Sequence, residues 1–201
     1  MRLYFQYLSS GFSNCYLLGT DSGEAIIVDP GMVDTNLVRT IEDNSYTIKG
    51  VLVTHDHSHH VKGLNTLMRI YETSIYAINP VVNDNPCSLV RDGDIISIGP
   101  FLTEVISIPG HSADSAVYKI DRLLFTGDSL TAGLMGNTAS LYAAATQVNA
   151  IRTKLFSLPG DFTILPGHGP PSSLEAERRF NMEIATFDMQ KIRSPVFKID
   201  N

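Results

Sequence analysis

Every histidine of this 201-residue chain falls in one of three short segments, residues 54–60, 109–112 and 166–170. The set is His55, His57, His59, His60, His111 and His168. Each segment directly follows an apolar run typical of a buried strand. Imidazole is the commonest metal ligand near neutral pH, because it binds as a neutral donor. A side chain at a strand end is rigidly aimed, so the three segments together predict a metal site.

The run in residues 54–60 can serve more than one cation. His55 and His57 are two residues apart at a strand end, so both can reach the same ion. His60 opens the following helix, so we expect it to point elsewhere, toward a second cation. The alternative is a solvated histidine-rich turn, but such tracts are more often metal sites.

Asp128 also follows an apolar strand run. A carboxylate has two oxygens and can bridge two cations, which a single imidazole nitrogen cannot do. Alone, Asp128 would be interpreted as the cap of a turn, but beside three histidine segments we interpret it as a ligand. Asp29 ends another strand, directly before Pro30. For Asp29, a turn-forming role and a supporting role behind the ligands are both open.

Short apolar strands and amphipathic helices must position these residues. The predicted strands are residues 3–7, 15–18, 25–28, 51–53, 75–78, 95–98, 102–108, 116–120, 123–125 and 162–165. The predicted helices are residues 33–43, 60–71 and 148–156, and a last helix capped by Ser172 or Ser173. Residues 131–146, rich in Ala, Gly and Thr, are predicted as a loop or lid. With no repeat and no linker, residues 1–201 are predicted as a single α/β domain.

Composition narrows the range of partners. The chain has 15 basic and 21 acidic side chains and a formal net charge of −6, which argues against a nucleic acid or an anionic membrane as partner. Two cysteines, Cys15 and Cys87, do not make a disulfide framework in a chain of this size. We find neither a secretory signal in residues 1–20 nor the ~18 apolar residues of a membrane helix. We therefore expect a cytoplasmic protein with a small-molecule substrate, and its oligomeric state is left open.

The spacing of the candidate ligands resembles that of the metallo-β-lactamase fold superfamily. Within it, the chain is most similar to the glyoxalase II-like (hydroxyacylglutathione hydrolase-like) hydrolases. The family pattern His-x-His-x-Asp-His falls on residues 55–60, with His59 at the Asp position. The family's later His, Asp and His fall on His111, Asp128 and His168. Flanking residues also match: 14–17, 29–31, 126–128 and 166–170, followed by Glu177 and Arg178.

The resemblance implies a four-layer αββα sandwich, in which helices flank two mixed sheets and the site lies at one edge of the sheets. It assigns His55, His57 and His111 to a first metal. It assigns His60 and His168 to a second metal, with Asp128 bridging both. The implied cofactor is a pair of zinc ions that hold a hydroxide, available at neutral pH without a side-chain base. The hydroxide attacks an acyl carbon, and a thiolate or alkoxide leaves.

His59 departs from the family pattern, which usually has Asp at this position. An imidazole is still a competent ligand, but the site loses a negative charge, so we expect the second metal to bind more weakly or to be a different metal. The alternative is that His59 points away and leaves the second site to His60 and His168; we interpret His59 as a ligand. Asp56 is a candidate substitute carboxylate and the one side chain with a candidate catalytic role.

Two further departures concern the substrate. Larger glyoxalase II enzymes grip glutathione with a C-terminal helical extension, whereas little more than one helix follows Arg179 here. Residues 129–137 also differ from the same segment in relatives, which predicts an altered substrate. Met135 and Tyr142 are candidate pocket residues, although loop packing is the favoured role for each.

Three functions fit these residues. We expect a metal-dependent hydrolase that uses a metal-bound hydroxide to cleave a thioester or a similar small acyl substrate, with two zinc ions as cofactor. The first alternative is an oxidoreductase similar to persulfide dioxygenases, with one iron held by His55, His111 and Asp128. The second is a non-catalytic metal-binding or ligand-sensing member of the fold. Iron or a mixed metal pair is the alternative cofactor.

Overall fold

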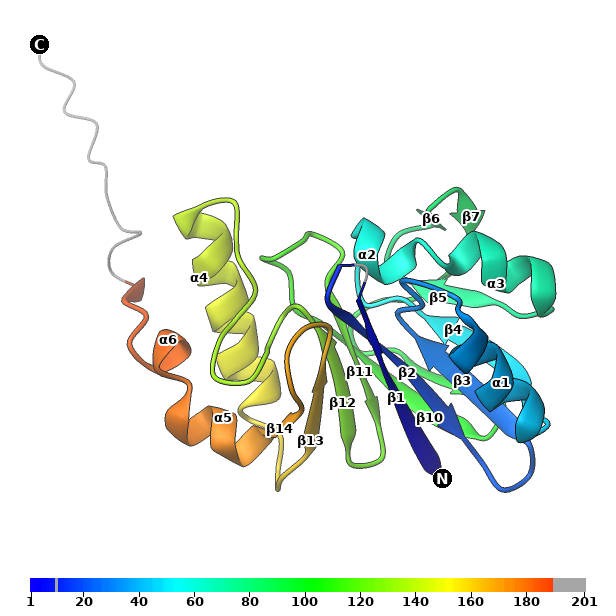
Figure 1. The fold of residues 1–201 in the computed structure, drawn as a ribbon. Helices are drawn as coiled ribbons and strands as arrows, with labels where there is room; N and C mark the ends of the chain where they lie inside the picture. Colours follow the sequence, from blue (N-terminus) through cyan, green and yellow to red (C-terminus); the bar gives the residue numbers. More distant parts are fainter. Residues whose placement is uncertain (10, 190–201) are drawn as a thin grey trace, which may run out of the picture.

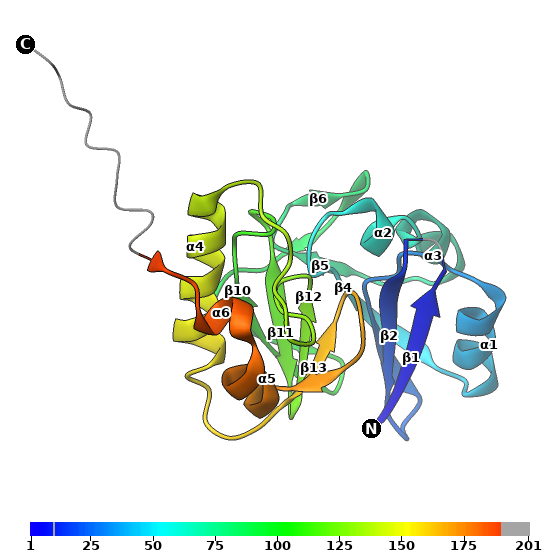
Figure 2. The same ribbon diagram turned by 60° about the vertical axis from the view of Figure 1, so that its left-hand side comes forward.

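Two six-stranded sheets lie face to face between two groups of helices (Figure 1, Figure 2). The structure is a computed structural model that describes residues 1–9 and 11–189. The first sheet contains, in order, β1 (Arg2–Leu8), β2 (Ser13–Gly19), β3 (Glu24–Val28), β4 (Thr47–Leu52), β5 (Ile75–Ala77) and β8 (Ser88–Leu89). The second contains β14 (Ser172–Ser173), β13 (Thr163–Pro166), β12 (Leu123–Gly127), β11 (Ala116–Ile120), β10 (Phe101–Ser107) and β9 (Ile95–Ile98). A small separate pair is formed by β6 (Val81–Val82) and β7 (Asn85–Pro86).

Both sheets are mixed. In the first, β1, β2 and β3 are antiparallel neighbours, whereas β3, β4, β5 and β8 run parallel to one another. In the second, β12 and β13 are parallel, and the other described pairs are antiparallel. Parallel neighbours need a crossover, and α1 (Thr35–Asp43) supplies it between β3 and β4. The predicted four-layer αββα sandwich of two mixed sheets is confirmed.

Strand alternation sorts the apolar side chains into layers. In β2, Tyr16 and Leu18 pack between the sheets with Phe125. Cys15 and Leu17 point the other way and pack with the buried residues of α1 and its neighbouring helices. Because both faces of β2 are covered, residues 15–18 within it form a continuous apolar run rather than an alternation of polar and apolar residues.

The helix predicted over residues 60–71 is in fact two helices. They are α2 (Ser58–Val61) and α3 (Leu64–Ile70). The break lies at Gly63, whose amide donates a hydrogen bond to the carbonyl oxygen of Pro30 at 2.9 Å. A Cβ on Gly63 would lie 2.3 Å from that oxygen, so the close approach of the two backbones requires glycine.

The helices on the second sheet include part of the predicted loop (Figure 1). They are α4 (Leu141–Ala150), which continues as a π-helical turn (Ile151–Leu155), α5 (Leu174–Phe180) and α6 (Met182–Ala185). Ser140 caps α4 by accepting a hydrogen bond from the Ala143 amide, so the prediction of a loop over residues 131–146 is wrong from residue 141 onward. The run of alanines hides the helical period, because it gives the helix little difference in hydrophobicity between its two faces. Ser173 rather than Ser172 caps α5, through the Ala176 amide.

Element lengths explain what the sequence patterns did not predict. The strands β6, β7 and β8 contain two residues each. A strand pattern becomes recognisable over about four residues, so these strands leave no signal in the sequence. Among the helices of residues 1–9 and 11–189, none combines the length and apolar character needed to cross a bilayer.

Candidate metal centre

The candidate ligands leave the two sheets at one edge. β4 ends three residues before His55, and β12 ends directly before Asp128. β13 ends two residues before His168, and His111 lies in the connection between β10 and β11. His60 lies on α2, which follows β4. Strand ends of both sheets therefore bring together residues that are far apart in the sequence.

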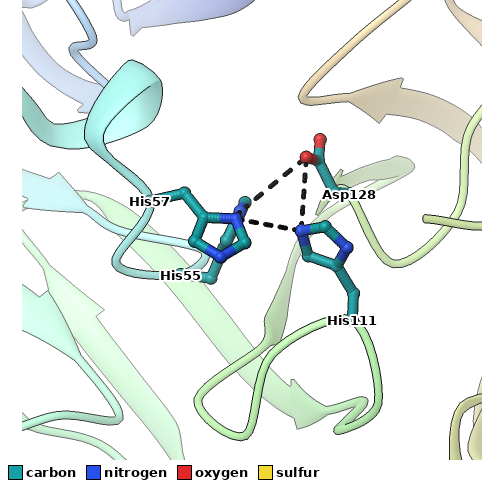
Figure 3. Close-up of side chains that lie close together, drawn as sticks. All are labelled: His55, His57, His111 and Asp128. Carbon is teal, nitrogen blue, oxygen red and sulfur yellow. Dashed lines mark hydrogen bonds and ion pairs between the residues drawn. The ribbon is translucent and has the colours of Figure 1, made fainter. Parts of the chain in front are cut away.

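Four side chains form a first group, which Figure 3 shows: His55, His57, His111 and Asp128. One ligand atom from each lies within 4.8 Å of the others. His57 Nδ1 lies 2.9 Å from His55 Nε2 and 3.0 Å from His111 Nε2. Asp128 Oδ2 lies 3.5 Å from that nitrogen of His111 and 3.8 Å from that of His55. Three nitrogens and one carboxylate oxygen are a donor set that suits a tetrahedral metal site.

A second group lies around the other oxygen of Asp128. It contains His55, His59, His60 and Asp128, with ligand atoms again within 4.8 Å of one another. Asp128 Oδ1 lies 3.5 Å from His60 Nε2 and 2.7 Å from His168 Nδ1. The two carboxylate oxygens thus face different histidines, an arrangement in which one aspartate can serve two metal ions.

His59 faces this second group. Its ring centroid lies 4.6 Å from that of His60 and 4.9 Å from that of His168. The alternative in which His59 points away therefore does not describe the structure. Asp56, the candidate substitute carboxylate, lies outside both groups. Its side chain is exposed and its amide donates to Asp114 Oδ2 at 2.9 Å, so the structure does not bring Asp56 to the ligands.

The cluster also passes an independent test of fit to a metal ion. His60 is fully buried, and neither of its ring nitrogens makes a hydrogen bond, although each lies within ion-pair distance of a carboxylate. Buried polar atoms without partners are costly, and a bound cation would satisfy Nε2. The backbone also makes room here, since a Cβ on Gly167 would lie 2.5 Å from His60 Cε1 and 2.6 Å from Asp128 Oδ1. Both groups are therefore capable of holding a metal.

Hydrogen bonds that His55 and His111 make through Nδ1 leave the Nε2 atom of each neutral ring without a proton. His111 Nδ1 donates to the carbonyl oxygen of Asn137 at 2.7 Å, because a carbonyl can only accept. Thr54 Oγ1 donates to Asp29 Oδ2 at 2.6 Å and therefore accepts from His55 Nδ1 at 3.1 Å. Such partners fix the orientation and tautomer of a metal-binding histidine. Sequence reasoning missed Thr54, whose place beside His55 was a signal, and Asn137, whose backbone carbonyl gives none.

Asp29 combines the two roles that its sequence context left open. Its backbone has a positive φ of 50° in the turn that ends β3. Its Oδ1 accepts a hydrogen bond from the Thr54 amide at 2.8 Å. Its Oδ2 accepts from the Thr54 hydroxyl and lies 3.3 Å from His60 Nδ1. The residue therefore shapes the turn and supports two candidate ligands.

Burial and neighbouring charges set the protonation of the ligands. Burial lowers the pKa of His55 to about 3, and nearby His60 adds to the effect, so His55 is neutral at physiological pH and available as a ligand. Burial by itself would lower the pKa of His60, but the carboxylates of Asp128 and Asp29 outweigh it and raise that pKa to about 9. Burial would raise the pKa of Asp128, yet His168 and His60 hold it well below its usual range, so this carboxylate is ionised.

A pocket of about 470 Å³ opens over both groups. Five of the candidate ligands line it, whereas His55 and His60 lie buried behind them. The segment after β12 forms another part of the lining, and we call residues 131–137 the lip loop. The lining residues are His57, His59, His111, Asp128, His168, Thr131, Leu134, Met135, Gly136 and Asn137. Met135 thus lines the pocket, whereas Tyr142 lies outside the lining and is 74% exposed. None of these lining residues is a lysine or an arginine.

A four-layer sandwich with histidine and aspartate groups at one sheet edge defines a class of metal-binding α/β proteins, and comparison with known proteins gives the family. The model of the metallo-beta-lactamase superfamily matches residues 9–82. An uncharacterized protein of Mycobacterium tuberculosis is 30% identical over an alignment that covers 84% of this chain and 91% of the relative. A hydroxyacylglutathione hydrolase of Francisella tularensis is 29% identical, over 84% of this chain and 68% of that protein. The chain belongs to the metallo-beta-lactamase superfamily and is similar to its glyoxalase II-like members.

Solved structures agree on the fold. ETHE1 from Myxococcus xanthus has a TM-score of 0.84 and 23% identity, covering 98% of this chain and 93% of that one. The B3 metallo-beta-lactamase BLEG-1 has a TM-score of 0.81 and 24% identity, covering 90% and 98%. TTHA1623, solved in a di-iron-bound form, has a TM-score of 0.75 and 24% identity, covering 89% and 98%. At these identities the likeness shows the fold and leaves the reaction open.

Proposed function

We propose that this protein is a metal-dependent hydrolase that cleaves a thioester or a similar small acyl compound. One observation carries the proposal: the two oxygens of Asp128 face different histidines, and side chains from both groups line one pocket. A site that holds two cations around a shared carboxylate is suited to hydrolysis. The similarity to a hydroxyacylglutathione hydrolase supports a thioester as the first substrate to test.

Each group of side chains has a defined task in this proposal. His55, His57 and His111 hold one metal with Asp128, and His59, His60 and His168 hold the other. When bound, such a metal pair makes hydroxide available at neutral pH and stabilises negative charge on an acyl oxygen. The ionised Asp128 offsets part of the cationic charge. The Thr54 hydroxyl and the Asn137 carbonyl hold two imidazoles in the tautomer that presents Nε2.

The pocket walls favour an uncharged acyl group. Leu134 and Met135 give the lip loop an apolar edge, and Leu134 is 59% exposed and accessible to a ligand. The lining residues include no lysine or arginine that could pair with an anionic acyl group. We therefore propose substrates whose acyl part is small and apolar and rests against the lip loop.

An iron-dependent oxidoreductase similar to persulfide dioxygenases is the second candidate. His59 is the observation that favours it. With an imidazole in place of the family's usual Asp, Asp128 is the one carboxylate in either group. A site with little negative charge binds a second dication weakly. A single iron bound by His55, His111 and Asp128 would use ligands of the first group only and would not need the second site.

Metal content, followed by two assays, tests the proposal. The protein is purified without chelators or a histidine tag and its metals are measured by elemental analysis. It is then assayed against thioesters and lactones, and for oxygen uptake with a persulfide. Two zinc ions per chain with acyl hydrolysis support the hydrolase, whereas one iron with oxygen uptake supports the oxidoreductase. Metal-loaded protein that does neither contradicts both and points to a non-catalytic metal-binding protein.

A matched pair of variants ties the activity to the site. His57 belongs to the first group alone, so His57→Ala should lose metal and hydrolysis together. Tyr142 is exposed and lies outside the pocket lining, so Tyr142→Ala should keep both. Hydrolysis that survives unchanged in His57→Ala would place the reaction elsewhere in the molecule.

A further inference from the structure

The lip loop lies directly on two of the candidate ligands. It begins three residues after Asp128, and the carbonyl oxygen of its last residue, Asn137, accepts the hydrogen bond from His111 Nδ1. At Gly136 the approach is so close that a Cβ would lie 2.1 Å from the Asp128 carbonyl oxygen and 2.8 Å from His111 Nδ1. A displacement of Gly136 or Asn137 would therefore also displace the His111 ring.

A buried carboxylate on α5 holds the start of this loop. Glu177 is 3% exposed, and both of its oxygens lie 3.1 Å from the amide nitrogen of Gly133, which donates to them. Glu177 also accepts hydrogen bonds from Ser172 Oγ at 2.7 Å and from Asn181 Nδ2 at 2.8 Å. Among the described residues no cation forms an ion pair with Glu177, so neutral donors alone satisfy this carboxylate.

The next two residues of the loop are held in the same way. Asn181 Nδ2 donates to the Leu134 carbonyl oxygen at 3.2 Å. Glu183 Oε2 accepts a hydrogen bond from the Met135 amide at 2.8 Å. Three consecutive loop residues, 133–135, thus bond through their backbones to side chains at the end of α5 and the start of α6. Two of the three, Leu134 and Met135, also form the apolar edge of the pocket.

The two helices that hold the loop, α5 and α6, are hydrogen-bonded to the π-helical turn and to the segment that follows it. Arg178, on α5, donates from Nε to the Phe156 carbonyl oxygen at 2.9 Å and from Nη1 to the Gly160 carbonyl oxygen at 2.8 Å. Arg152, in the π-helical turn, donates from Nη2 to the Ile184 carbonyl oxygen in α6 at 2.5 Å. The α5–α6 segment therefore acts on the lip loop from a fixed position.

We propose that α5 and α6 brace the lip loop, and that Glu177 is a positioning residue of the metal centre. Through the loop, Glu177 holds the Asn137 carbonyl against His111 Nδ1 and holds Leu134 and Met135 against the acyl group. The kinetic part of this inference rests on the proposed hydrolase function, whereas the part that concerns metal binding does not. Outer partners of metal ligands change metal affinity by about 10–100-fold when they are lost.

Zinc affinity and amide hydrogen exchange of residues 131–137 test the metal-binding part in the full-length protein. Glu177→Ala should weaken zinc binding about tenfold and speed exchange across the lip loop. Glu177→Gln should fall between Ala and the native residue, because its amide oxygen can still accept from Gly133 or Ser172. Glu175→Ala is the matched control on the same helix, because Glu175 is half exposed and forms an ion pair with the exposed Arg179, and it should leave both readouts unchanged.

A merely structural role predicts a different result. If Glu177→Ala lowers the free energy of unfolding but keeps native zinc affinity and loop exchange, the proposal is wrong. Should both Glu177 variants fail to fold, Glu183→Ala keeps the proposal testable, because Glu183 is exposed and its loss does not threaten the core. Unchanged loop exchange in Glu183→Ala would also overturn the brace.

Steady-state kinetics distinguish a failure of the proposed hydrolase function from a failure of the proposed brace. Glu183→Ala should raise KM for an acyl substrate several-fold and leave kcat within about twofold. It releases Met135 at the apolar edge, while Glu177 and Asn181 still hold the lip loop beside His111. An equal KM for variant and native protein contradicts the role of the brace in substrate positioning. If the native protein hydrolyses no acyl substrate, the proposed function fails, and zinc affinity and loop exchange still decide on the brace.

Discussion

Oδ1 of Asp128 lies 2.7 Å from Nδ1 of His168, and this contact joins the ends of the parallel neighbours β12 and β13. The two residues are 40 positions apart in the sequence. They meet because both strands end at the same edge of the second sheet. The other oxygen, Oδ2, lies 3.5 Å from His111 Nε2, so one carboxylate faces histidines of both groups.

Replacement of Asp128 by Asn should remove both metals together. The variant keeps the size of the side chain but has no charge and only one oxygen, so it cannot serve two cations. We expect metal content and hydrolysis to fall together to background, as measured by elemental analysis and a thioester assay. Asp121→Asn is a control at an exposed turn where Asn tolerates the positive φ of 51°. Full metal content with full activity in Asp128→Asn would rule out the shared-carboxylate site.

His59→Asp should strengthen binding of the second metal. His59 faces His60 and His168, and a carboxylate there would add a negative charge beside a dication. We expect the second zinc to bind about tenfold or more tightly, measured by competition with a chromophoric chelator. His59→Ala serves as the comparison and should lose the second metal. The same stoichiometry and affinity in all three proteins would mean that His59 takes no part in metal binding.

Thr54→Val should weaken the first metal and the fold together. The substitution keeps the shape but removes the hydroxyl that links Asp29 to His55, and it leaves buried polar atoms without a partner. We expect zinc affinity to fall about 10–100-fold and the free energy of unfolding to fall by about 1–3 kcal/mol. Thr54→Ser keeps the hydroxyl and should behave like the native protein. Native zinc affinity in Thr54→Val would show that the hydroxyl does not orient His55.

The thiols of Cys15 and Cys87 should be alkylated slowly, and Cys87 should be alkylated before Cys15. Burial raises the pKa of Cys15 far above its ordinary value, and burial also raises the pKa of the half-buried Cys87. A raised pKa leaves less thiolate at a given pH, so alkylation near pH 8 should be slower than for a free cysteine and should still accelerate above pH 9. Peptide mass spectrometry should find Cys87 labelled first and Cys15 labelled after unfolding in urea. Rapid labelling of Cys15 in the folded protein would contradict this order.

The sequence by itself determined the fold class and the candidate ligands. A strand that is buried on both faces contains a continuous run of apolar residues. The strands that precede His55, Asp128 and His168 contain such runs, and their predicted positions are close to the observed ones. Histidine is uncommon enough that six of them, confined to three segments that each follow a strand, indicated a metal site. Local patterns of this kind need no knowledge of the rest of the chain.

Other features were decided by packing between distant segments. The break at Gly63 follows from the approach of the Pro30 carbonyl, and the helix that begins at residue 141 is hidden in a run of small residues. The direction of His59 was open in the sequence, because an imidazole can face a metal or solvent equally well.

The support behind the ligands was decided by tertiary structure alone. The partner of His111 is the backbone carbonyl of Asn137, and a backbone carbonyl has the same chemistry at every residue. The contact of Glu177 with the Gly133 amide joins residues 44 positions apart. No spacing or residue type in the sequence indicates such pairs, because the packing of α5 against the lip loop, rather than a local pattern, places a carboxylate beside that particular amide.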